Sequence, residues 1–272
     1  MFHPRPGRAG MLHFLPNHQE RSVKKAFPVI DTHAHVDELP DPEAAIKEAQ
    51  EGDVVAIVAV GQDLSSNQKT LKIADQHPGF VFPAIGYHPW RLNPDHDDET
   101  LAYIDTNLEH CVALGEVGLD YKAKTKKKIQ KGIFQKLLAI AKKHDKPVIV
   151  HCRYVHETAY RMVKEAGVER AIFHWYSGPL DLIPLIAAHG YYMSATPALL
   201  YNPYHAKAIA AVPLSNLLLE TDTPVQYQEL AARPVHVQVT LQEVARVKGV
   251  TAEEIAAQTT QNAKACFGLK DL

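Results

Sequence analysis

Residues 28–36, Pro-Val-Ile-Asp-Thr-His-Ala-His-Val, combine a short apolar run with two histidines at its end. The run is typical of a buried β-strand, and residues two apart on a strand project to the same face. His33 and His35 can therefore reach one metal ion together. A hydrogen-bonded pair of structural histidines would show the same spacing, so this stretch alone predicts half of a metal site and leaves that alternative open.

Alternating strands and helices follow this first strand. Residues 54–60, Val-Val-Ala-Ile-Val-Ala-Val, have the pattern of a strand buried on both faces. Asp41-Pro42-Glu43 predicts a helix start with Asp41 as its cap. Further strands are expected near residues 80–85, 111–115, 147–151, 170–174, 191–195 and 216–220, and further helices near 64–76, 97–109, 127–145, 156–166, 180–188, 204–211, 235–247 and 252–264.

Eight predicted strands, each followed by a helical stretch, favour a closed (β/α)8 TIM barrel of the α/β class over an open doubly wound sheet. The chain has 272 residues, a length at which such a barrel forms one compact unit. We therefore expect a single barrel domain over residues 28–272, preceded by a poorly defined N-terminal extension of residues 1–27.

The composition narrows the class of protein. Hydrophobic residues make up 46% of the chain and charged residues 22%, which is typical of a globular protein with a large core. A formal net charge of -2 gives no broad cationic surface, so a polyanion would need a local basic patch. The cysteines have no metal-finger spacing, and no signal or membrane segment is evident. These features favour a cytoplasmic protein without a membrane partner or an obligate protein partner.

The carboxyl ends of barrel strands form one mouth, where the chemistry of such barrels takes place. Six side chains of metal-ligand type are expected at these ends. Each could separately be a hydrogen-bonded histidine or a helix cap, but six on one face favour a divalent-metal site. They are His33, His35, Glu116, His151, His174 and Asp222.

The sequence resembles the TatD family of metal-dependent hydrolases, within the wider amidohydrolase-like barrels. The matching segments occur in family order along nearly the whole predicted barrel. They are Asp31-Thr-His-Ala-His, Gly86-Tyr-His-Pro, Gly115-Glu-Val-Gly-Leu-Asp-Tyr121, Pro147-Val-Ile-Val-His-Cys-Arg153, Phe173-His-Trp-Tyr-Ser-Gly178, Glu220-Thr-Asp-Thr-Pro224 and Asn262-Ala.

The resemblance implies a pair of divalent cations. His33 and His35 would hold one of them, and His151 and His174 would hold the other, with Glu116 bridging the two. Zn²⁺, Mn²⁺ and Mg²⁺ are the candidates, and a shell rich in histidine favours Zn²⁺ or Mn²⁺.

The implied reaction is hydrolysis of phosphodiester bonds in DNA by an exonucleolytic deoxyribonuclease. A hydroxide shared between two cations forms near neutral pH, because the metals lower the pKa of bound water. Asp222, beside the first cation, would take its proton and pass it to the leaving oxygen, and Glu116 is the other residue expected to be catalytic. The alternative is hydrolysis of a small cyclic amide, lactone or ester, because the same centre polarises a carbonyl group.

Three further residues are candidates for substrate contact. His88 could face the pocket or order its own loop, and Arg153 could clamp a phosphate or pair with a carboxylate. Tyr121, like Trp90 and Trp175, could stack on a base, although packing is the more common role of aromatic residues near a barrel mouth.

Two segments depart from the family pattern. Family members commonly carry Arg-Gly-x-x-Asn after the last metal-binding aspartate, whereas residues 225–233 here are Val-Gln-Tyr-Gln-Glu-Leu-Ala-Ala-Arg. This loop shapes one wall of the mouth, so substrate preference does not follow from the metal ligands. Residues 122–131, Lys-Ala-Lys-Thr-Lys-Lys-Lys-Ile-Gln-Lys, could form a phosphate-binding rim or a solvated helix start, which is the usual role of a charge run.

Overall fold

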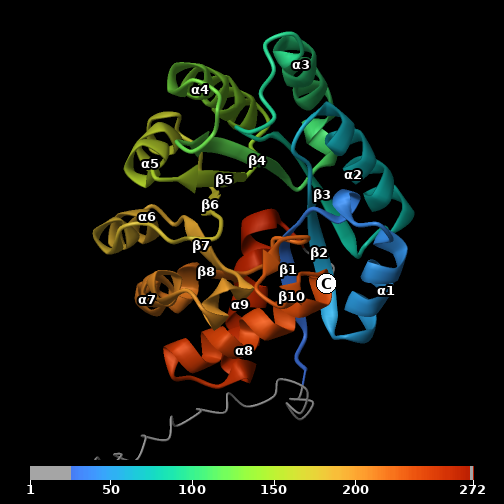
Figure 1. The fold of residues 1–272 in the computed structure, drawn as a ribbon, viewed down its shortest axis with the longest axis vertical. Helices are drawn as coiled ribbons and strands as arrows, with labels where there is room; N and C mark the ends of the chain where they lie inside the picture. Colours follow the sequence, from blue (N-terminus) through green and yellow to red (C-terminus); the bar gives the residue numbers. More distant parts are fainter. Residues whose placement is uncertain (1–25, 270–271) are drawn as a thin grey trace, which may run out of the picture.

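The structure, a computed structural model, describes residues 26–269 and 272. Eight strands form one sheet in chain order from β1 to β8, with helices arranged around them (Figure 1). All neighbouring strands are parallel, so the predicted (β/α)8 barrel is confirmed. Of the predicted N-terminal extension, only residues 26 and 27 fall within the described range, and residues 1–25 lie outside it.

The strands and helices alternate along the chain as predicted. The strands are β1 Val29–Ala34, β2 Val54–Val60, β3 Val81–Tyr87, β4 Ala113–Asp120, β5 Val148–Arg153, β6 Ala171–Phe173, β7 Tyr192–Ala195 and β8 Leu217–Leu219. The helices are α1 Pro42–Glu51, α2 Leu64–Gln76, α3 Asp97–Asn107, α4 Lys127–Lys143, α5 His156–Glu165, α6 Ile183–Ala188, α7 Pro203–Ala211, α8 Val237–Lys248 and α9 Ala252–Phe267.

Local sequence signals explain where several helices begin. The Asp41 carboxylate accepts a hydrogen bond from the Ala44 amide at 3.0 Å, which confirms the predicted start of α1. At the start of α9, Thr251 and Glu254 form a reciprocal capping box. Within the described residues, no helix combines the length and the apolar character that crossing a membrane requires.

The barrel closes between β1 and the segment after β8. The Asp222 amide donates to the His33 carbonyl at 2.9 Å, and the His35 amide donates to the Thr223 carbonyl at 2.8 Å. Below this pair, the buried Asp31 carboxylate accepts hydrogen bonds from the Thr221 amide and hydroxyl at 2.9 and 2.6 Å. Closure therefore brings the two ends of the barrel chain into direct backbone contact at the mouth.

Two apolar clusters lie on opposite sides of the strands. The larger cluster fills the space between strands and helices and includes Ile57, Leu114 and Val150. The smaller one contains alternate strand residues such as Val58 and Ile149, together with the end of α9. Because side chains on a strand alternate in direction, this second cluster occupies the barrel interior. The side chains of this interior cluster are apolar, and the candidate metal ligands lie beyond it at the mouth.

One strand predicted from the sequence needs correction. The strand expected at residues 111–115 begins at Ala113 and continues to Asp120, so Glu116 lies within β4 and not after it. Gly118 lies inside this longer strand, although interior glycines usually weaken a strand. Its φ is 148°, and a side chain there would collide with the His151 backbone, so the position requires glycine. The loop at residues 225–233 contains a short hairpin of strands β9 Gln226–Tyr227 and β10 Leu230–Ala231.

The Asn67 side chain of α2 forms hydrogen bonds with the backbone at the end of β3, in the way that a neighbouring strand would. Its side-chain amide donates to the Gly86 carbonyl at 2.8 Å and accepts from the Gly86 amide at 2.9 Å, and the residue is fully buried. Gly86 in turn lies against the backbone of Gly115 and Glu116, where a side chain would collide. Asn67 therefore fixes the part of the sheet that carries Glu116.

We expect Asn67→Ala to lower the free energy of unfolding by about 2 kcal/mol or more, because two buried backbone groups of Gly86 lose their partners. Gln68→Ala, on the exposed side of the same helix, should change it by no more than about 0.5 kcal/mol. Urea unfolding of the two variants and the wild type measures this difference. Equal midpoints for both variants would show that the Asn67 hydrogen bonds contribute nothing.

Candidate metal centre

The six predicted ligands converge at the carboxyl end of the barrel. His33 and Glu116 lie in β1 and β4, His151 in β5, and the others in the segments that directly follow β1, β6 and β8. Five of them are at most 7% exposed, and His151 is half-buried. The sequence therefore identified a set of side chains that the fold places together.

A first group forms where the barrel closes. The Nε2 atoms of His33 and His35 lie 3.1 Å apart, and each lies 3.5 Å from Oδ1 of Asp222. Nδ1 of His35 is 2.7 Å from the Val60 carbonyl, which can only accept, so Nδ1 carries the hydrogen. In neutral His35 the Nε2 lone pair is therefore directed at this group, as metal binding requires.

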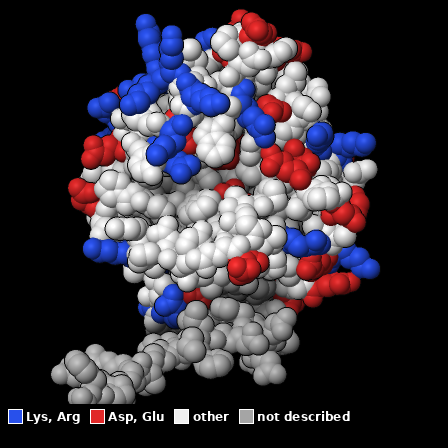
Figure 2. Space-filling model, viewed as in Figure 1, with Lys and Arg blue, Asp and Glu red and all other residues white. Residues whose placement is uncertain are grey.

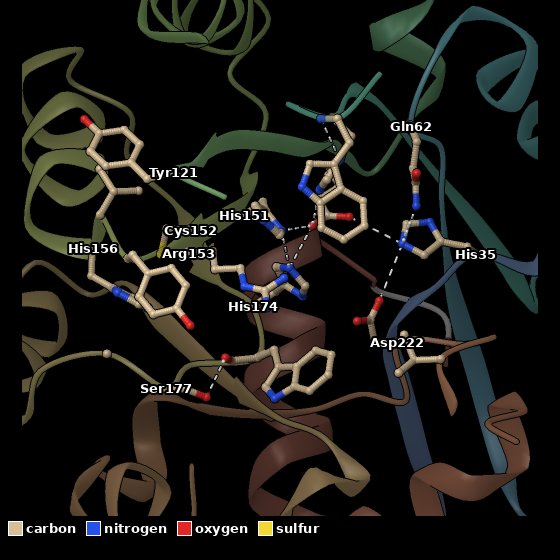
Figure 3. A pocket seen from close by; sticks show the side chains of 18 of the residues that line it. His35, Gln62, Tyr121, His151, Cys152, Arg153, His156, His174, Ser177 and Asp222 are labelled. Atoms are coloured by element: carbon tan, nitrogen blue, oxygen red, sulfur yellow. Dashed lines mark hydrogen bonds and ion pairs between the residues drawn. The ribbon is translucent and has the colours of Figure 1, made fainter. Parts of the chain in front are cut away.

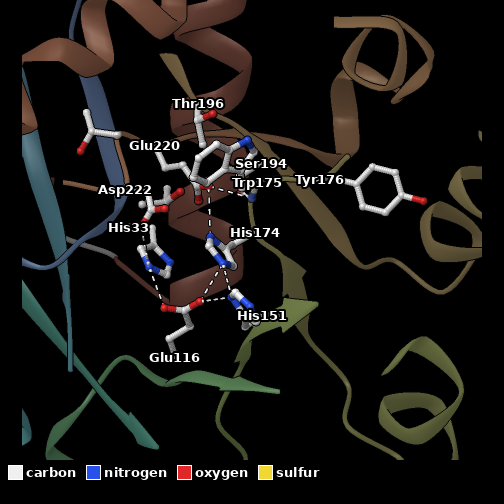
Figure 4. Close-up of polar contacts among 12 residues, drawn as sticks. His33, Glu116, His151, His174, Trp175, Tyr176, Ser194, Thr196, Glu220 and Asp222 are labelled. Atoms are coloured by element: carbon white, nitrogen blue, oxygen red, sulfur yellow. Dashed lines mark hydrogen bonds and ion pairs between the residues drawn. The ribbon is translucent and has the colours of Figure 1, made fainter. Parts of the chain in front are cut away.

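A second group shares the Glu116 carboxylate with the first. Oε2 of Glu116 lies 3.5 Å from Nε2 of His33 and 3.4 Å from Nε2 of His35. The other oxygen, Oε1, lies 2.7 Å from both Nδ1 of His151 and Nε2 of His174 (Figure 4). Glu116 thus presents one oxygen to each group, which is the geometry of a bridging ligand.

His88 belongs to this centre more closely than the sequence indicated. Its Nε2 lies 3.5 Å from Oε1 of Glu116, and together with His151 they form a further trio whose ligand atoms lie within 4.8 Å of one another. Burial lowers the pKa of His88 to about 3, so this imidazole is neutral at neutral pH and keeps a lone pair. His88, expected as a substrate contact, is therefore also a candidate ligand.

Two carboxylates that the predicted set does not include contact the histidines at the ring nitrogens that face away from Glu116. Oδ2 of Asp120 lies 3.1 Å from Nε2 of His151, and Oε1 of Glu220 lies 3.4 Å from Nδ1 of His174. Carboxylates in such positions set the tautomer and the orientation of ligating histidines. Strand periodicity could have identified Asp120, which lies four residues beyond Glu116 in β4, whereas Glu220 lies after the end of β8 and has no such signal.

Imidazoles and carboxylates in the centre stabilise each other's charged forms. Burial raises the pKa of Glu116, but the nearby His174 and His88 outweigh this effect and hold that pKa well below its usual range. Burial lowers the pKa of His174, and its contacts with Glu116 and Glu220 outweigh that effect and leave the pKa well above its usual range. Cations could replace the protons that these groups share, because metal ligands bind in their deprotonated forms.

The donor set fits a pair of divalent cations. Ligand atoms held about 2.1 Å from a tetrahedral ion lie roughly 3.4 Å from one another. The ligand separations described above range from 2.7 to 3.5 Å and are of this size. Imidazole nitrogen and carboxylate oxygen are suitable donors for Zn²⁺ or Mn²⁺. One cation fits His33, His35, Asp222 and Oε2 of Glu116, and the other fits the group around Oε1.

The centre lies in the wall of a pocket of about 1180 Å³ (Figure 3). His88, Arg153 and Tyr121, the predicted substrate contacts, all line this pocket, as do His156 and Ser177, which the sequence did not single out. Their placement agrees with a role in substrate binding and leaves that role a prediction.

The two tryptophans near the mouth differ in environment. Packing was the expected role of Trp90, but its side chain is 57% exposed and its indole nitrogen donates to Asp120 at 2.7 Å. Its ring also packs edge-on against His88, with ring centroids 5.1 Å apart, so Trp90 has both a packing contact and an exposed face. Trp175 packs as expected, with its ring centroid 5.3 Å from that of Tyr227.

Comparison with known proteins agrees with this geometry. The family model described as TatD related DNase matches residues 30–268. The chain is 28% identical to deoxyribonuclease TATDN3 of Homo sapiens, over 88% of this chain and 94% of that protein. It is 33% identical to the uncharacterized metal-dependent hydrolase YabD of Bacillus subtilis, over 88% of this chain and 98% of that protein.

Solved structures show the same fold. The crystal structure of YjjV, a TatD homologue from Escherichia coli, matches with a TM-score of 0.83 and 28% identity, over 89% of this chain and 98% of that one. A TatD family hydrolase from Entamoeba histolytica matches with a TM-score of 0.79 over 91% of this chain and 100% of that one. Its identity is 18%, so this second likeness concerns the fold alone.

We expect the protein, reconstituted with Zn²⁺ or Mn²⁺, to bind close to two cations per chain. His151→Ala should lower this number to about one, because it removes a ligand from the group around Oε1 and leaves His33, His35 and Asp222 intact. Elemental analysis of the desalted protein measures the stoichiometry. His96→Ala, an exposed histidine outside the pocket, should keep both cations. Absence of bound metal in the reconstituted wild type would exclude the centre.

Proposed function

Because this chain belongs to the TatD-related DNase family of metal-dependent hydrolases, we propose that it hydrolyses phosphodiester bonds in DNA as an exonuclease. The observation that carries the proposal is the Glu116 carboxylate, which presents one oxygen to each of two buried ligand groups. A centre for two cations suits phosphodiester hydrolysis, since the attacking and leaving oxygens both need charge stabilisation. The name of the human relative, a deoxyribonuclease, points to the same substrate.

Asp222 is the side chain best placed to move a proton. It lines the pocket, and its Oδ1 lies 3.5 Å from the Nε2 atoms of both His33 and His35. Burial raises the pKa of Asp222, but contacts with His35 and His33 outweigh that effect and lower it. The carboxylate is therefore anionic at neutral pH, and we assign it the roles of accepting a proton from the attacking water and passing it to the leaving oxygen.

Cations bound at this centre would lower the pKa of water and stabilise negative charge on the attacked phosphate. Glu116 would fix the positions of both ligand groups relative to each other, because one of its oxygens lies near each group. Asp120 and Glu220 would keep His151 and His174 oriented for binding, since each lies behind the ring that it contacts.

A basic rim beside the mouth favours a polyanionic substrate. Figure 2 shows Lys and Arg side chains gathered above the central hollow, on the α4 side. No ion pair among the described residues involves a lysine of residues 122–128. Several of these lysines precede or begin α4, where positive charge opposes the helix dipole, so helix stability does not explain them.

Hydrolysis of single-stranded DNA in the presence of Mn²⁺ or Mg²⁺ tests the proposed function. Nucleotides should be released from DNA, whereas lactones and cyclic amides should be turned over slowly or not at all. The same centre polarises a carbonyl group, so turnover of a lactone or amide without DNA hydrolysis would replace the proposal with the alternative substrate class.

We expect Asp222→Asn to lower turnover by about 10²- to 10⁴-fold while the fold stays intact, because the amide keeps the shape of the carboxylate but cannot accept the proton. Steady-state hydrolysis of DNA, with circular dichroism and metal analysis of the same sample, measures this. Asp98→Asn, at an exposed aspartate of α3, is the matched control. Activity of Asp222→Asn within a few-fold of wild type would remove Asp222 from the proposed role.

The lysine rim makes a separate prediction about DNA binding. Changing its four central lysines to Gln should weaken binding to all sequences alike. The slope of log K against log salt should fall by roughly 0.7 for each phosphate of a single strand that the variant no longer binds. The variant combines changes at Lys124, Lys126, Lys127 and Lys128.

The charge-matched control changes four exposed helix lysines outside the pocket lining to Gln. It should leave the slope of log K against log salt unchanged. An unaltered slope in the rim variant, with intact DNA hydrolysis, would identify the rim as a solvated helix start. Hydrolysis of a minimal phosphodiester, too short to reach the rim, should be the same in both variants. The control lysines are Lys47, Lys72, Lys164 and Lys207.

A further inference from the structure

We propose that Tyr154 is a stacking platform for one unpaired base of the substrate strand, and that Lys122 and Arg153 hold the phosphate next to it. This inference rests on the proposed function. It adds where the substrate strand binds and that the bound nucleotide is unpaired. The strand would cross the mouth over the end of β5, and the nucleotide bound there would be single-stranded.

The exposure of Tyr154 is the first observation. Its side chain is 66% exposed although the residue lies between β5 and α5 and lines the pocket. Among the described residues, its ring pairs with no other aromatic ring and its hydroxyl forms no hydrogen bond. A large flat surface is thus accessible to a ligand within the pocket.

The backbone of Tyr154 is the second observation. Its φ is +61°, in the left-handed region that Gly and Asn adopt readily and a bulky side chain rarely does. Such strained residues concentrate at binding and active sites, where the surrounding structure holds them. If only the turn from β5 to α5 mattered, glycine would serve better at this position.

Trp175 shows what a structural aromatic residue in the same conformation looks like. Its φ is +43°, its amide donates to Glu220 at 2.8 Å, and its ring packs against Tyr227. These contacts account for the strained backbone of Trp175. Tyr154 has no comparable ring contact within the described part of the chain, so the packing of the protein does not account for its side chain.

Two positively charged side chains lie over the Tyr154 ring at the outer limit of a cation–π contact. Nζ of Lys122 lies 5.5 Å and Cζ of Arg153 lies 5.8 Å from the ring centroid. The Tyr121 amide donates to the Arg153 carbonyl at 3.1 Å, which keeps the ends of β4 and β5 side by side. Arg153 extends into the pocket (Figure 3), and no carboxylate of residues 26–269 pairs with either cation.

An aromatic face flanked by cations without carboxylate partners suits a nucleotide. Base stacking is tolerant of sequence because every base has a flat π-face, while Lys and Arg bind the backbone phosphate. A base inside a duplex is already stacked on both sides and cannot lie on Tyr154. The platform therefore selects a single strand or a frayed end over intact duplex.

Binding of oligonucleotides to the full-length, Mn²⁺-loaded protein tests the platform. The probes are a thymidine oligonucleotide with cleavage-resistant phosphorothioate links and an abasic one of equal length and linkage. The readout is the ratio of their dissociation constants by fluorescence anisotropy. Wild type should prefer the base-bearing probe, and Tyr154→Gly should reduce that preference by roughly 5- to 150-fold, which is the usual range for one stacked base.

Matched variants separate the stacking role from other effects. Tyr154→Trp keeps a ring and should keep the preference, as should Tyr204→Ala, which removes a tyrosine that is 79% exposed outside the pocket lining. Lys122→Gln and Arg153→Gln should weaken binding of both probes alike and leave the ratio unchanged. Tyr154→Gly should melt at or above the wild-type temperature, because glycine relieves the left-handed backbone.

An unchanged ratio in a folded Tyr154→Gly variant would overturn the platform, whether or not DNA is hydrolysed. The proposed function fails separately, if the wild type releases no nucleotides from single-stranded DNA with Mn²⁺. A lowered ratio without hydrolysis would support the platform as a nucleic-acid site and reject the exonuclease. A strong wild-type preference for duplex over single-stranded DNA would also count against the platform.

Discussion

The backbone pairing that closes the barrel is the constraint on which the centre depends. Hydrogen bonds from Asp222 to His33 and from His35 to Thr223 join the end of β1 to the segment after β8. Residues almost two hundred positions apart thereby present their side chains to one point. Without this closure, Asp222 would not lie beside His33 and His35.

Closure of the barrel also buries several imidazoles and carboxylates close together, which is unfavourable in free energy. Transferring imidazoles and carboxylates out of water is unfavourable unless they are paired. Glu116 reduces that cost, because its oxygens serve two groups of histidines at once. Asp120 and Glu220 extend the pairing behind the rings, and bound cations would complete it. The charged rim and the exposed Tyr154 lie outside this core, where solvent compensates their charge and exposure.

Much of the fold followed from the sequence because its signals are local. Apolar runs such as residues 54–60 fixed the strands, Asp41-Pro42 fixed a helix start, and the strand count favoured a closed barrel. The carboxyl ends of parallel strands meet at one edge whatever the details of packing. His33, His35, His151, His174 and Asp222 could therefore be grouped in advance, and their identity as metal-ligand types determined the candidate chemistry.

Only the tertiary structure decided how the candidate metal ligands divide into two groups around Glu116. The two oxygens of Glu116 point to different histidines because β4 continues past Gly115 and lies against β5, a packing effect that local pattern does not contain. The approach of His88 to Glu116 likewise depends on neighbouring strands. The exposed, left-handed Tyr154 has no local signature at all. A sequence determines which side chains are available, whereas distances, exposure and backbone strain arise from contacts between segments that are far apart in the chain.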